Sequence, residues 1–138
     1  MSGLPRPKLD TNLECDVVIV GGGMAGLATA YLLTGAGKAV VLLERGRLAE
    51  GDTGYTTAHL TMVTDTQLTD LVRRFGPDHG RAVWDAGLAA ISEIDTIVRT
   101  HDIGCDFQWV DGYLHAPRSH DDQDLSSFEE EAALAVEL

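Results

Sequence analysis

The sequence predicts an α/β fold in which two parallel strands flank a single helix. Residues 15–20 and 39–43 are short apolar runs rich in valine, a composition typical of strands that are covered on both faces. Three consecutive glycines lie between the runs, followed by a stretch with helical spacing of apolar residues. Because little besides a helix separates the strands, we expect a right-handed crossover within one sheet.

Local signals define the elements next to these strands. Residues 1–14 contain two prolines and are expected to form an extended leader. The first helix is predicted over residues 24–36, where two nearby glycines end it. Residues 45–64 show no periodicity and lack Ser and Pro, so we expect a packed loop rather than a flexible linker.

Two helices are predicted after this loop. Residues 68–75 place their apolar side chains on one face and are followed by Gly76. Pro77 suits the first turn of the next helix, which is predicted to reach about residue 101. The apolar stripe of this longer helix is expected at Val83, Ala86, Ala90, Ile94, Ile97 and Val98.

A β-hairpin is predicted within residues 105–117. Residues 107–110 and 113–116 are short β-like runs on either side of Asp111-Gly112, a dipeptide favoured in two-residue hairpin turns. The sequence therefore predicts an antiparallel pair of strands after the helices.

One more helix is predicted at the end of the sequence. Residues 119–122 can cap it, because they include side chains that accept hydrogen bonds from helix N-terminal amides. Its buried face is expected to carry Leu125, Phe128, Ala132 and Ala135. The helix reaches Leu138 without a glycine stop or a basic last turn, which suggests that the sequence is part of a longer chain.

Composition narrows the possible partners. Twenty-two acidic residues against ten Lys and Arg give a formal net charge of -12 over 138 residues, which disfavours nucleic acid and anionic membranes as partners. The sequence has no apolar run of membrane-spanning length and no signal-peptide pattern. Its two cysteines form no CxxC pair and predict neither a disulfide framework nor a metal site. We therefore expect a soluble, cytoplasmic protein.

The glycine-rich turn carries the chemistry of the sequence. Gly21, Gly23 and Gly26 match the pattern GxGxxG between a strand and a helix, and Glu44 ends the second strand. In such a unit the first glycine allows a tight turn, the second a close approach of a pyrophosphate and the third close packing of helix on strand. The helix N-terminal amides, which include those of Met24 and Ala25, attract phosphate, and the acid accepts hydrogen bonds from ribose hydroxyls.

There are three alternatives to an FAD- or NAD-type dinucleotide site at this turn. A turn without a ligand stays open, whereas a Walker phosphate loop and an NADP site are disfavoured. A glycine-rich turn of this kind can also connect strand and helix without binding a ligand. A Walker phosphate loop fits poorly, because Gly37-Lys38 is followed by alanine. NADP is disfavoured because Glu44 would repel its 2'-phosphate, although Arg45 and Arg47 are basic residues nearby.

The motif and the loop after it resemble a known family. GGGMAGLATAYLL with Glu44 resembles the N-terminal FAD-binding motif of the D-amino-acid-oxidase-like flavoprotein oxidoreductases, and GDTGYTTAHLT is similar to the segment that these proteins place beside the flavin. TTAHL and the D-G-Y-L sequence at 111–114 are most similar to members fused to a C-terminal Rieske iron-sulfur domain. The resemblance covers residues 15–138, the N-terminal part of a much longer family chain.

The resemblance implies a fold, a cofactor and a reaction. It implies a Rossmann-like FAD-binding βαβ unit with added helices and a hairpin that begins a substrate domain. It also implies hydride transfer from an amine- or amino-acid-type small-molecule substrate to FAD, and a Rieske domain in a longer form of the chain. It adds Arg45 and the loop residues to the expected cofactor contacts: Thr53, Gly54, Thr56, Thr57 and His59.

Some features of the sequence limit this interpretation. Many relatives have a basic residue where Tyr55 follows Gly54, and no catalytic set is identifiable. A polar loop histidine without a flavin contact is the simpler interpretation of His59. An NAD-binding dehydrogenase module and an inactive remnant that keeps only the nucleotide-binding unit are the alternative functions.

Overall fold

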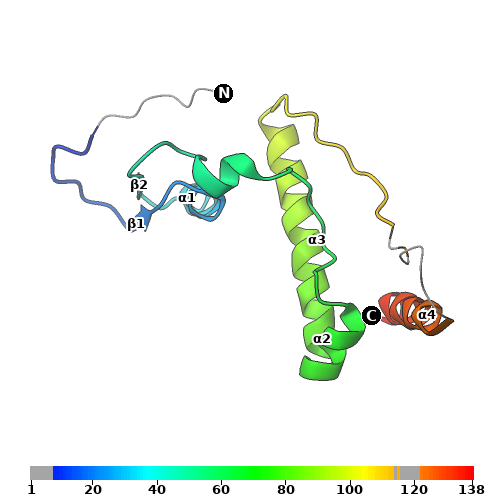
Figure 1. Ribbon diagram of the computed structural model, residues 1–138. Coiled ribbons are helices and arrows are strands. Elements are labelled where there is room, and N and C mark those ends of the chain that lie inside the picture. The colour runs from blue at the N-terminus through cyan, green and yellow to red at the C-terminus, as the bar shows by residue number, and fades with distance from the viewer. Residues whose placement is uncertain (1–7, 114, 116–121) are drawn as a thin grey trace. The chain divides into compact units, whose positions relative to one another are not determined.

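The computed structural model describes residues 8–113, 115 and 122–138, and the side chains of 122–125 are not described. The chain divides into two compact units, Met1–His59 and Leu60–Leu138. Within the described residues, seven elements follow one another along the chain (Figure 1). Three parts of the predicted elements lie outside the described residues: residues 1–7 of the leader, residues 114, 116 and 117 of the hairpin, and residues 119–121 at the start of the last helix.

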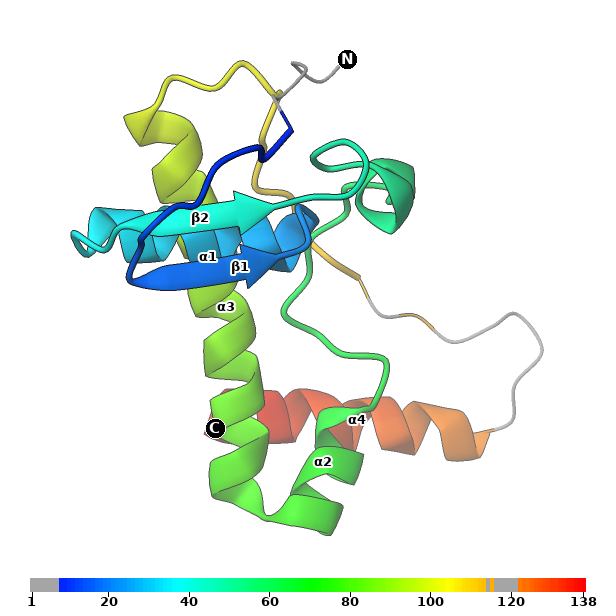
Figure 2. The same cartoon turned by 90° about the vertical axis from the view of Figure 1, so that its left-hand side faces the viewer.

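The first unit is a βαβ arrangement. Strands β1 (Val17–Val20) and β2 (Val40–Leu43) form a two-stranded parallel sheet, and helix α1 (Met24–Gly35) connects them. Val17 pairs with Val40 and Val20 with Leu43, so the two strands end side by side. Figure 2 shows α1 lying along one face of this sheet. The predicted strands and helix are confirmed, with each strand starting one or two residues later than expected.

Hydrogen bonds donated by backbone amides fix both ends of this sheet. At one end the Asp16 carboxylate accepts a hydrogen bond of 2.8 Å from the Ala39 amide. At the other end the Gly21 amide donates to the Leu43 carbonyl at 2.8 Å. Because parallel strands end at the same sheet edge, this register places the glycine-rich turn beside Glu44.

The loop after β2 contains one short regular element. A 3₁₀ helix, η1 (Gly51–Tyr55), interrupts the predicted loop, and Thr53 is its only residue that is not exposed. Ala49 and Gly51, on either side of the N-cap residue Glu50, have positive φ values of 58° and 71°. The loop is therefore ordered by local turns rather than by a core of its own.

The second unit is helical. Helix α2 (Leu68–Phe75) is followed directly by α3 (Pro77–Thr100), and Gly76 joins them with φ of 88°, a conformation that glycine adopts without steric cost. Both helices match their predicted ranges. Leu68 is 1% exposed and Ile91 is 9% exposed, and these two residues are the buried apolar core among the described residues.

The face that α3 buries differs in part from the predicted stripe. Ile94, Ile97 and Val98 are partly buried, in agreement with it, but Val83, Ala86 and Ala90 are exposed. Gly80 and Ile91 are buried instead, and Trp84 and Gly87 are partly buried. A Cβ on Gly80 would come 2.7 Å from the Val72 side chain, and one on Gly87 would come 2.9 Å from the Met62 Cα. The prediction counted apolar side chains and overlooked glycines, which pack here because they have no side chain.

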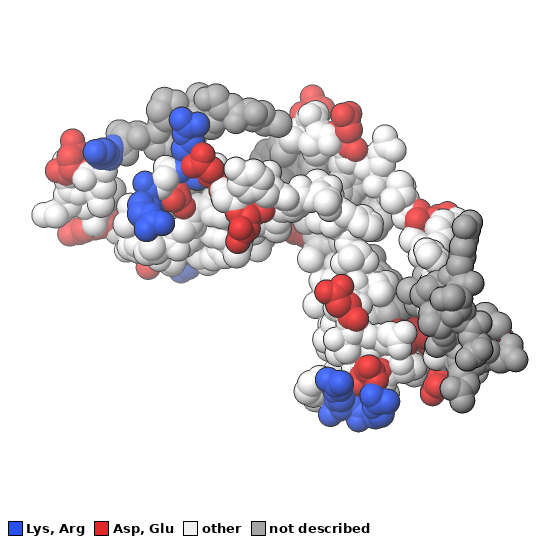
Figure 3. Space-filling view, viewed as in Figure 1, with Lys and Arg blue, Asp and Glu red and all other residues white. Residues whose placement is uncertain are grey.

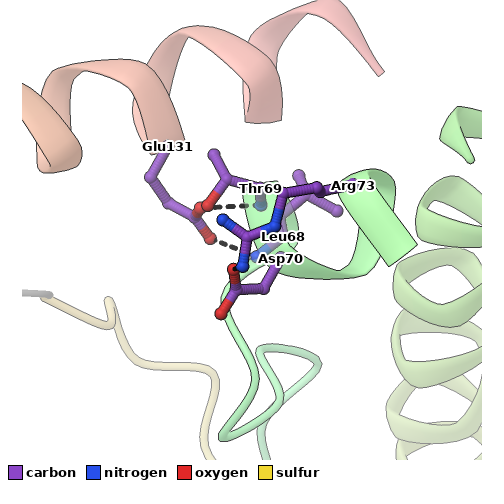
Figure 4. A network of polar contacts seen from close by, with 5 residues as sticks. All are labelled: Leu68, Thr69, Asp70, Arg73 and Glu131. Atoms are coloured by element: carbon purple, nitrogen blue, oxygen red, sulfur yellow. Dashed lines mark hydrogen bonds and ion pairs between the residues drawn. The ribbon is translucent and has the colours of Figure 1, made fainter. Parts of the chain in front are cut away.

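Helix α4 (Asp122–Glu137) buries an acidic residue. Glu131 is 7% exposed, while Ala132 of the predicted apolar face is exposed. The Glu131 carboxylate accepts hydrogen bonds from the amides of Leu68, at 2.5 Å, and Thr69, at 3.0 Å (Figure 4). Glu131 therefore caps the N-terminus of α2 from a distant helix, and the predicted face is wrong at Ala132.

The predicted hairpin does not form in the described residues. Residues 107–113 carry no strand, and Val110 and Tyr113 are 72% and 84% exposed. A two-stranded hairpin is marginal unless another strand or a helix covers it, and these side chains have no such cover. The predicted strand over 107–110 is therefore wrong.

This segment is attached to α3 instead. The Trp109 indole donates to the Asp95 carboxylate at 3.1 Å, and Arg99 Nε donates to the same group at 2.8 Å. Arg99, followed by Trp109, lowers the pKa of Asp95 through these hydrogen bonds. The Phe107 ring packs edge-on against Trp109 with ring centroids 5.9 Å apart.

On the face that Figure 3 shows, Lys and Arg atoms lie on the first unit and at the α2 end of the second unit. Arg73 and Arg74 lie in the last turn of α2. Cations in that position favour the helix dipole. In the described part of the chain, no helix has the length and apolar character needed to cross a membrane.

Candidate functional site

The glycine-rich turn allows α1 to lie directly on β1. A Cβ added to Gly26 would overlap the carbonyl oxygen of Gly21 and would lie 3.1 Å from its carbonyl carbon. Gly21 has φ of 108°, and a Cβ there would meet no atom within 4 Å. Gly26 is therefore required for packing and Gly21 for its backbone conformation, as the sequence motif predicts.

The N-terminus of α1 has a distant cap. Gly23 occupies the N-cap position and has no side chain to offer, and the first helical hydrogen bond runs from Leu27 to Gly23 at 2.9 Å. The hydroxyl of Thr53 accepts a hydrogen bond of 3.2 Å from the Met24 amide. Sequence reasoning placed Thr53 near the phosphates, but nothing in the sequence pairs it with this amide.

Glu44 lies at the turn and is held by two backbone amides. Its Oε2 accepts from the Gly22 amide at 2.7 Å, and its Oε1 accepts from the Gly46 amide at 2.6 Å. The hydrogen bond from the Gly46 amide favours the ionised carboxylate and is the largest cause of a lowered pKa at Glu44. The hydrogen bond from the Gly22 amide is the second cause. A carboxylate oxygen has two lone pairs, so each oxygen keeps acceptor capacity after its amide contact.

The lowered pKa of Glu44 gives a pH prediction. The pKa of Glu44 is lower in the folded state than in the unfolded state, so the amide contacts stabilise the fold at pH above the ordinary carboxyl range. This stabilisation is lost as the pH falls through the lowered pKa. In an NMR titration the Glu44 carboxyl carbon should titrate at lower pH than that of a blocked glutamate peptide. The Gly22 and Gly46 amides should shift with the same midpoint. Titration at or above the peptide value would contradict these contacts.

The loop after Glu44 packs back onto the turn. The Ala49 amide donates to the Gly22 carbonyl at 2.8 Å, and a Cβ on Gly22 would overlap the Leu48 side chain. Gly22 is the middle glycine, to which the motif gives no role, and it is the buried residue of the turn. A hollow of about 250 Å³ follows this loop, lined by Arg47, Leu48, Ala49, Glu50, Gly51, Gly54 and Tyr55.

The other predicted contacts are less defined. Arg45 is exposed and lowers the pKa of Glu44 less than Gly46 and Gly22 do. A Cβ added to Gly54 would lie 3.2 Å from the Ala49 carbonyl oxygen. Thr56, whose hydroxyl accepts from the Ala58 amide at 2.8 Å, Thr57 and His59 are exposed. The structure thus brings Gly21, Gly23, Met24, Gly26, Glu44 and Thr53 together, and it shows no contact from Thr56, Thr57 or His59 to the turn.

The turn fits the ADP part of FAD. The space beside Gly23 is free of a Cβ, the N-terminal amides of α1 point out of the helix, and an ionised acid ends β2. No group of three or more potential metal ligands occurs among the described residues.

Comparison with known proteins agrees with this geometry. The family model described as FAD dependent oxidoreductase matches residues 16–138. YhfW of Bacillus subtilis, named as a Rieske 2Fe-2S iron-sulfur protein, is 41% identical over 109 residues, which cover 79% of this chain. Gamma-glutamylputrescine oxidoreductase of Escherichia coli is 29% identical over 104 residues, which cover 75% of it. OrdL of Haemophilus influenzae, named as an oxidoreductase, is 29% identical over 107 residues, 78% of the chain.

These relatives are much longer than this chain. The matched regions span 21% of YhfW and 24% of each of the other two proteins. No solved structure gives a significant match. The family match covers nearly the whole chain and includes the turn and Glu44, so the chain belongs to the family of FAD-dependent oxidoreductases, whose cofactor is FAD.

Proposed function

We propose that this chain is the FAD-binding portion of an oxidoreductase that passes a hydride from an amine- or amino-acid-type substrate to flavin. The observation that carries the proposal is the packing of Gly26 on the Gly21 carbonyl beside an ionised Glu44. This arrangement leaves backbone amides and one acid facing the same turn, and it supports a Rossmann-like interpretation of the βαβ unit.

Each part of the turn has a proposed contact with the ADP portion. The ribose hydroxyls would donate to the lone pairs of Glu44 that Gly22 and Gly46 leave open. The diphosphate would accept from the amides of Met24, Ala25 and Gly26, where the helix dipole favours negative charge. Arg45, Gly54, Thr56, Thr57 and His59 remain proposed contacts of the pyrophosphate and flavin end.

The substrate class is proposed from the relatives. Gamma-glutamylputrescine oxidoreductase is named for an amine substrate, and shorter matches include an L-amino-acid oxidase and a flavin-containing amine oxidase. The chemistry that bound FAD supplies is two-electron oxidation of a substrate C–H bond by hydride transfer, while the protein binds and orients. We also propose a Rieske iron-sulfur domain as a partner in a longer form of the chain, on the likeness to YhfW.

Titration with nucleotides tests the binding function. The chain should bind ADP and FAD at one saturable site, and Gly23→Val should remove binding because its side chain fills the space beside the Met24 amide. Gly35→Ala is the matched control, since a Cβ there meets no atom within 4 Å. Tight NADH binding without affinity for FAD would instead favour an NAD-binding dehydrogenase module.

The substrate proposal needs a separate measurement. A longer form of the chain that includes the substrate domain, loaded with flavin, should lose its flavin absorbance under anaerobic conditions when an amine or amino acid is added. A longer form that holds flavin but is reduced by neither class would overturn the substrate proposal and leave the binding function intact.

A further inference from the structure

We propose that Leu48 is a positioning residue of the nucleotide site, which packs on Gly22 and so keeps the Glu44 carboxylate in place for the ribose. This inference rests on the proposed function, because it explains how the acid of that site is oriented. The GxGxxG pattern assigns no role to Leu48 or to Gly22.

The Glu44 carboxylate is held by one local contact and one distant contact. Its Oε1 accepts from the Gly46 amide, two residues later in the chain, at 2.6 Å. Its Oε2 accepts from the Gly22 amide, 22 residues earlier, at 2.7 Å. Only the second contact ties the acid to the glycine-rich turn, so the orientation of the carboxylate depends on where the Gly22 amide lies.

Leu48 and Glu44 share the space beside the Gly22 Cα. A Cβ on Gly22 would overlap Leu48 Cδ2, and it would lie 3.2 Å and 3.3 Å from the Cβ and Cγ of Glu44. The leucine methyl group and the stem of the acid therefore both lie where a side chain of Gly22 would project. Gly22 is buried and Leu48 is partly buried, although Arg47 and Ala49 beside it are exposed. Leu48 is thus the side chain of this loop that packs on the turn.

The backbone after Leu48 holds this packing in place. The Ala49 amide donates to the Gly22 carbonyl at 2.8 Å, while the Gly22 amide donates to Glu44. Ala49 has φ of 58°, a left-handed conformation that is sterically costly for a residue with a Cβ. Such a conformation persists where surrounding contacts impose it, and here the hydrogen bond to Gly22 does so. Gly22 is therefore held on both of its backbone polar groups and on its Cα.

Removing the Leu48 side chain should loosen Glu44. Water would reach the space beside Gly22 and compete for its amide, which leaves the carboxylate with the local Gly46 contact alone. A carboxylate held by one amide faces the ribose in a smaller fraction of molecules, and the apparent affinity falls by that fraction. Hydrogen bonds to a charged group correspond to about a tenfold or larger change in an equilibrium constant. Leu48→Ala should therefore bind ADP about tenfold more weakly than the natural chain.

Calorimetric titration of the 138-residue chain with ADP and with 2',3'-dideoxy-ADP tests this role. The second nucleotide lacks the ribose hydroxyls, so Leu48→Ala should bind it as tightly as the natural chain does. A loss confined to the nucleotide with hydroxyls distinguishes positioning of the acid from general damage to the fold. Leu32→Ala truncates a leucine of α1 that is 53% exposed, and this matched control should bind both nucleotides like the natural chain.

An exchange of size between the two packed residues gives a second test. Gly22→Ala alone should weaken ADP binding, because its methyl group overlaps Leu48 Cδ2. When it is combined with Leu48→Ala, the methyl group enters the space that the leucine has left. The double variant should therefore bind ADP more tightly than either single variant, and a double variant that binds no better than both would overturn the inference.

The Glu44 carboxyl group gives a readout that needs no nucleotide. The Gly22 hydrogen bond is one of the causes that lower the pKa of Glu44. In Leu48→Ala the NMR titration midpoint of the Glu44 carboxyl carbon should therefore rise toward that of a glutamate peptide. Leu32→Ala should leave this midpoint unchanged.

The outcomes separate the inference from the proposed function. If the natural chain binds ADP while Leu48→Ala binds it equally well, or loses affinity for both nucleotides alike, the inference fails and the nucleotide-binding function stands. An unchanged Glu44 midpoint in Leu48→Ala would also overturn the inference alone. Absence of ADP binding in the natural chain and in every variant would overturn both.

Discussion

Replacing Gly26 by alanine is expected to destabilise the first unit by about 2 kcal/mol and to lower ADP affinity at least tenfold. The new Cβ would overlap the Gly21 carbonyl oxygen, a backbone atom that cannot move without displacing β1. Overpacking lowers the free energy of unfolding by about 1–3 kcal/mol. Alanine has a better helix propensity than glycine, which offsets about 1 kcal/mol of the cost of the clash. The displaced turn would also move the Met24 amide away from the nucleotide.

Hydrogen exchange of the β1 and β2 amides measures this effect. Tryptophan fluorescence does not, because both tryptophans, Trp84 and Trp109, belong to the second unit. Gly35→Ala is the control within the same helix, and it should stabilise α1 by up to about 1 kcal/mol. Equal stability of the two variants would show that α1 does not pack on β1 as closely as the Gly26 geometry requires.

The nucleotide unit was predictable because its signals are local. Gly21 and Gly26 are five residues apart, and the strand that follows places Glu44 beside them through a parallel register. Gly26 is required by its contact with the Gly21 carbonyl, and Gly21 by its own backbone conformation. The family resemblance rests on these residues, and the family match confirms it.

Other contacts depend on residues far apart in sequence. Thr53 is one of five threonines between residues 45 and 64, and the sequence does not distinguish the one that reaches Met24. Gly80 and Gly87 face the neighbouring helix and loop, but a search for apolar periodicity counts neither. The strand predicted over residues 107–110 failed for a related reason, since Asp111-Gly112 favours a turn and cannot supply the cover that isolated strands need.

Glu131 is the clearest example of a contact without a sequence signal. It is one of three consecutive glutamates, and a run of acids normally indicates a solvated helix face. In the structure Glu130 is exposed, whereas Glu131 is buried against the first turn of α2. Only the packing of α4 on α2 determines which acid turns inward.

Replacing Glu131 by alanine should therefore destabilise the second unit by about 3 kcal/mol. The change removes both acceptors of the Leu68 and Thr69 amides, and hydrogen bonds to charged groups contribute about 1.5–3 kcal/mol. Leu68 is 1% exposed, so water has little access to its amide. Urea unfolding followed by tryptophan fluorescence reports this unit, because both indoles lie in it.

Two further variants show whether the capping contact itself carries this stability. Glu131→Gln keeps one acceptor oxygen but has no charge. Its free energy of unfolding should therefore fall by about half as much as that of Glu131→Ala. Glu130→Ala removes an exposed acid from the same helix and should stay within about 0.5 kcal/mol of the natural chain. If Glu131→Ala behaved like Glu130→Ala, the carboxylate would not hold α4 on α2. If Glu131→Gln were as damaging as Glu131→Ala, both oxygens of the charged carboxylate would be needed to satisfy the two amides.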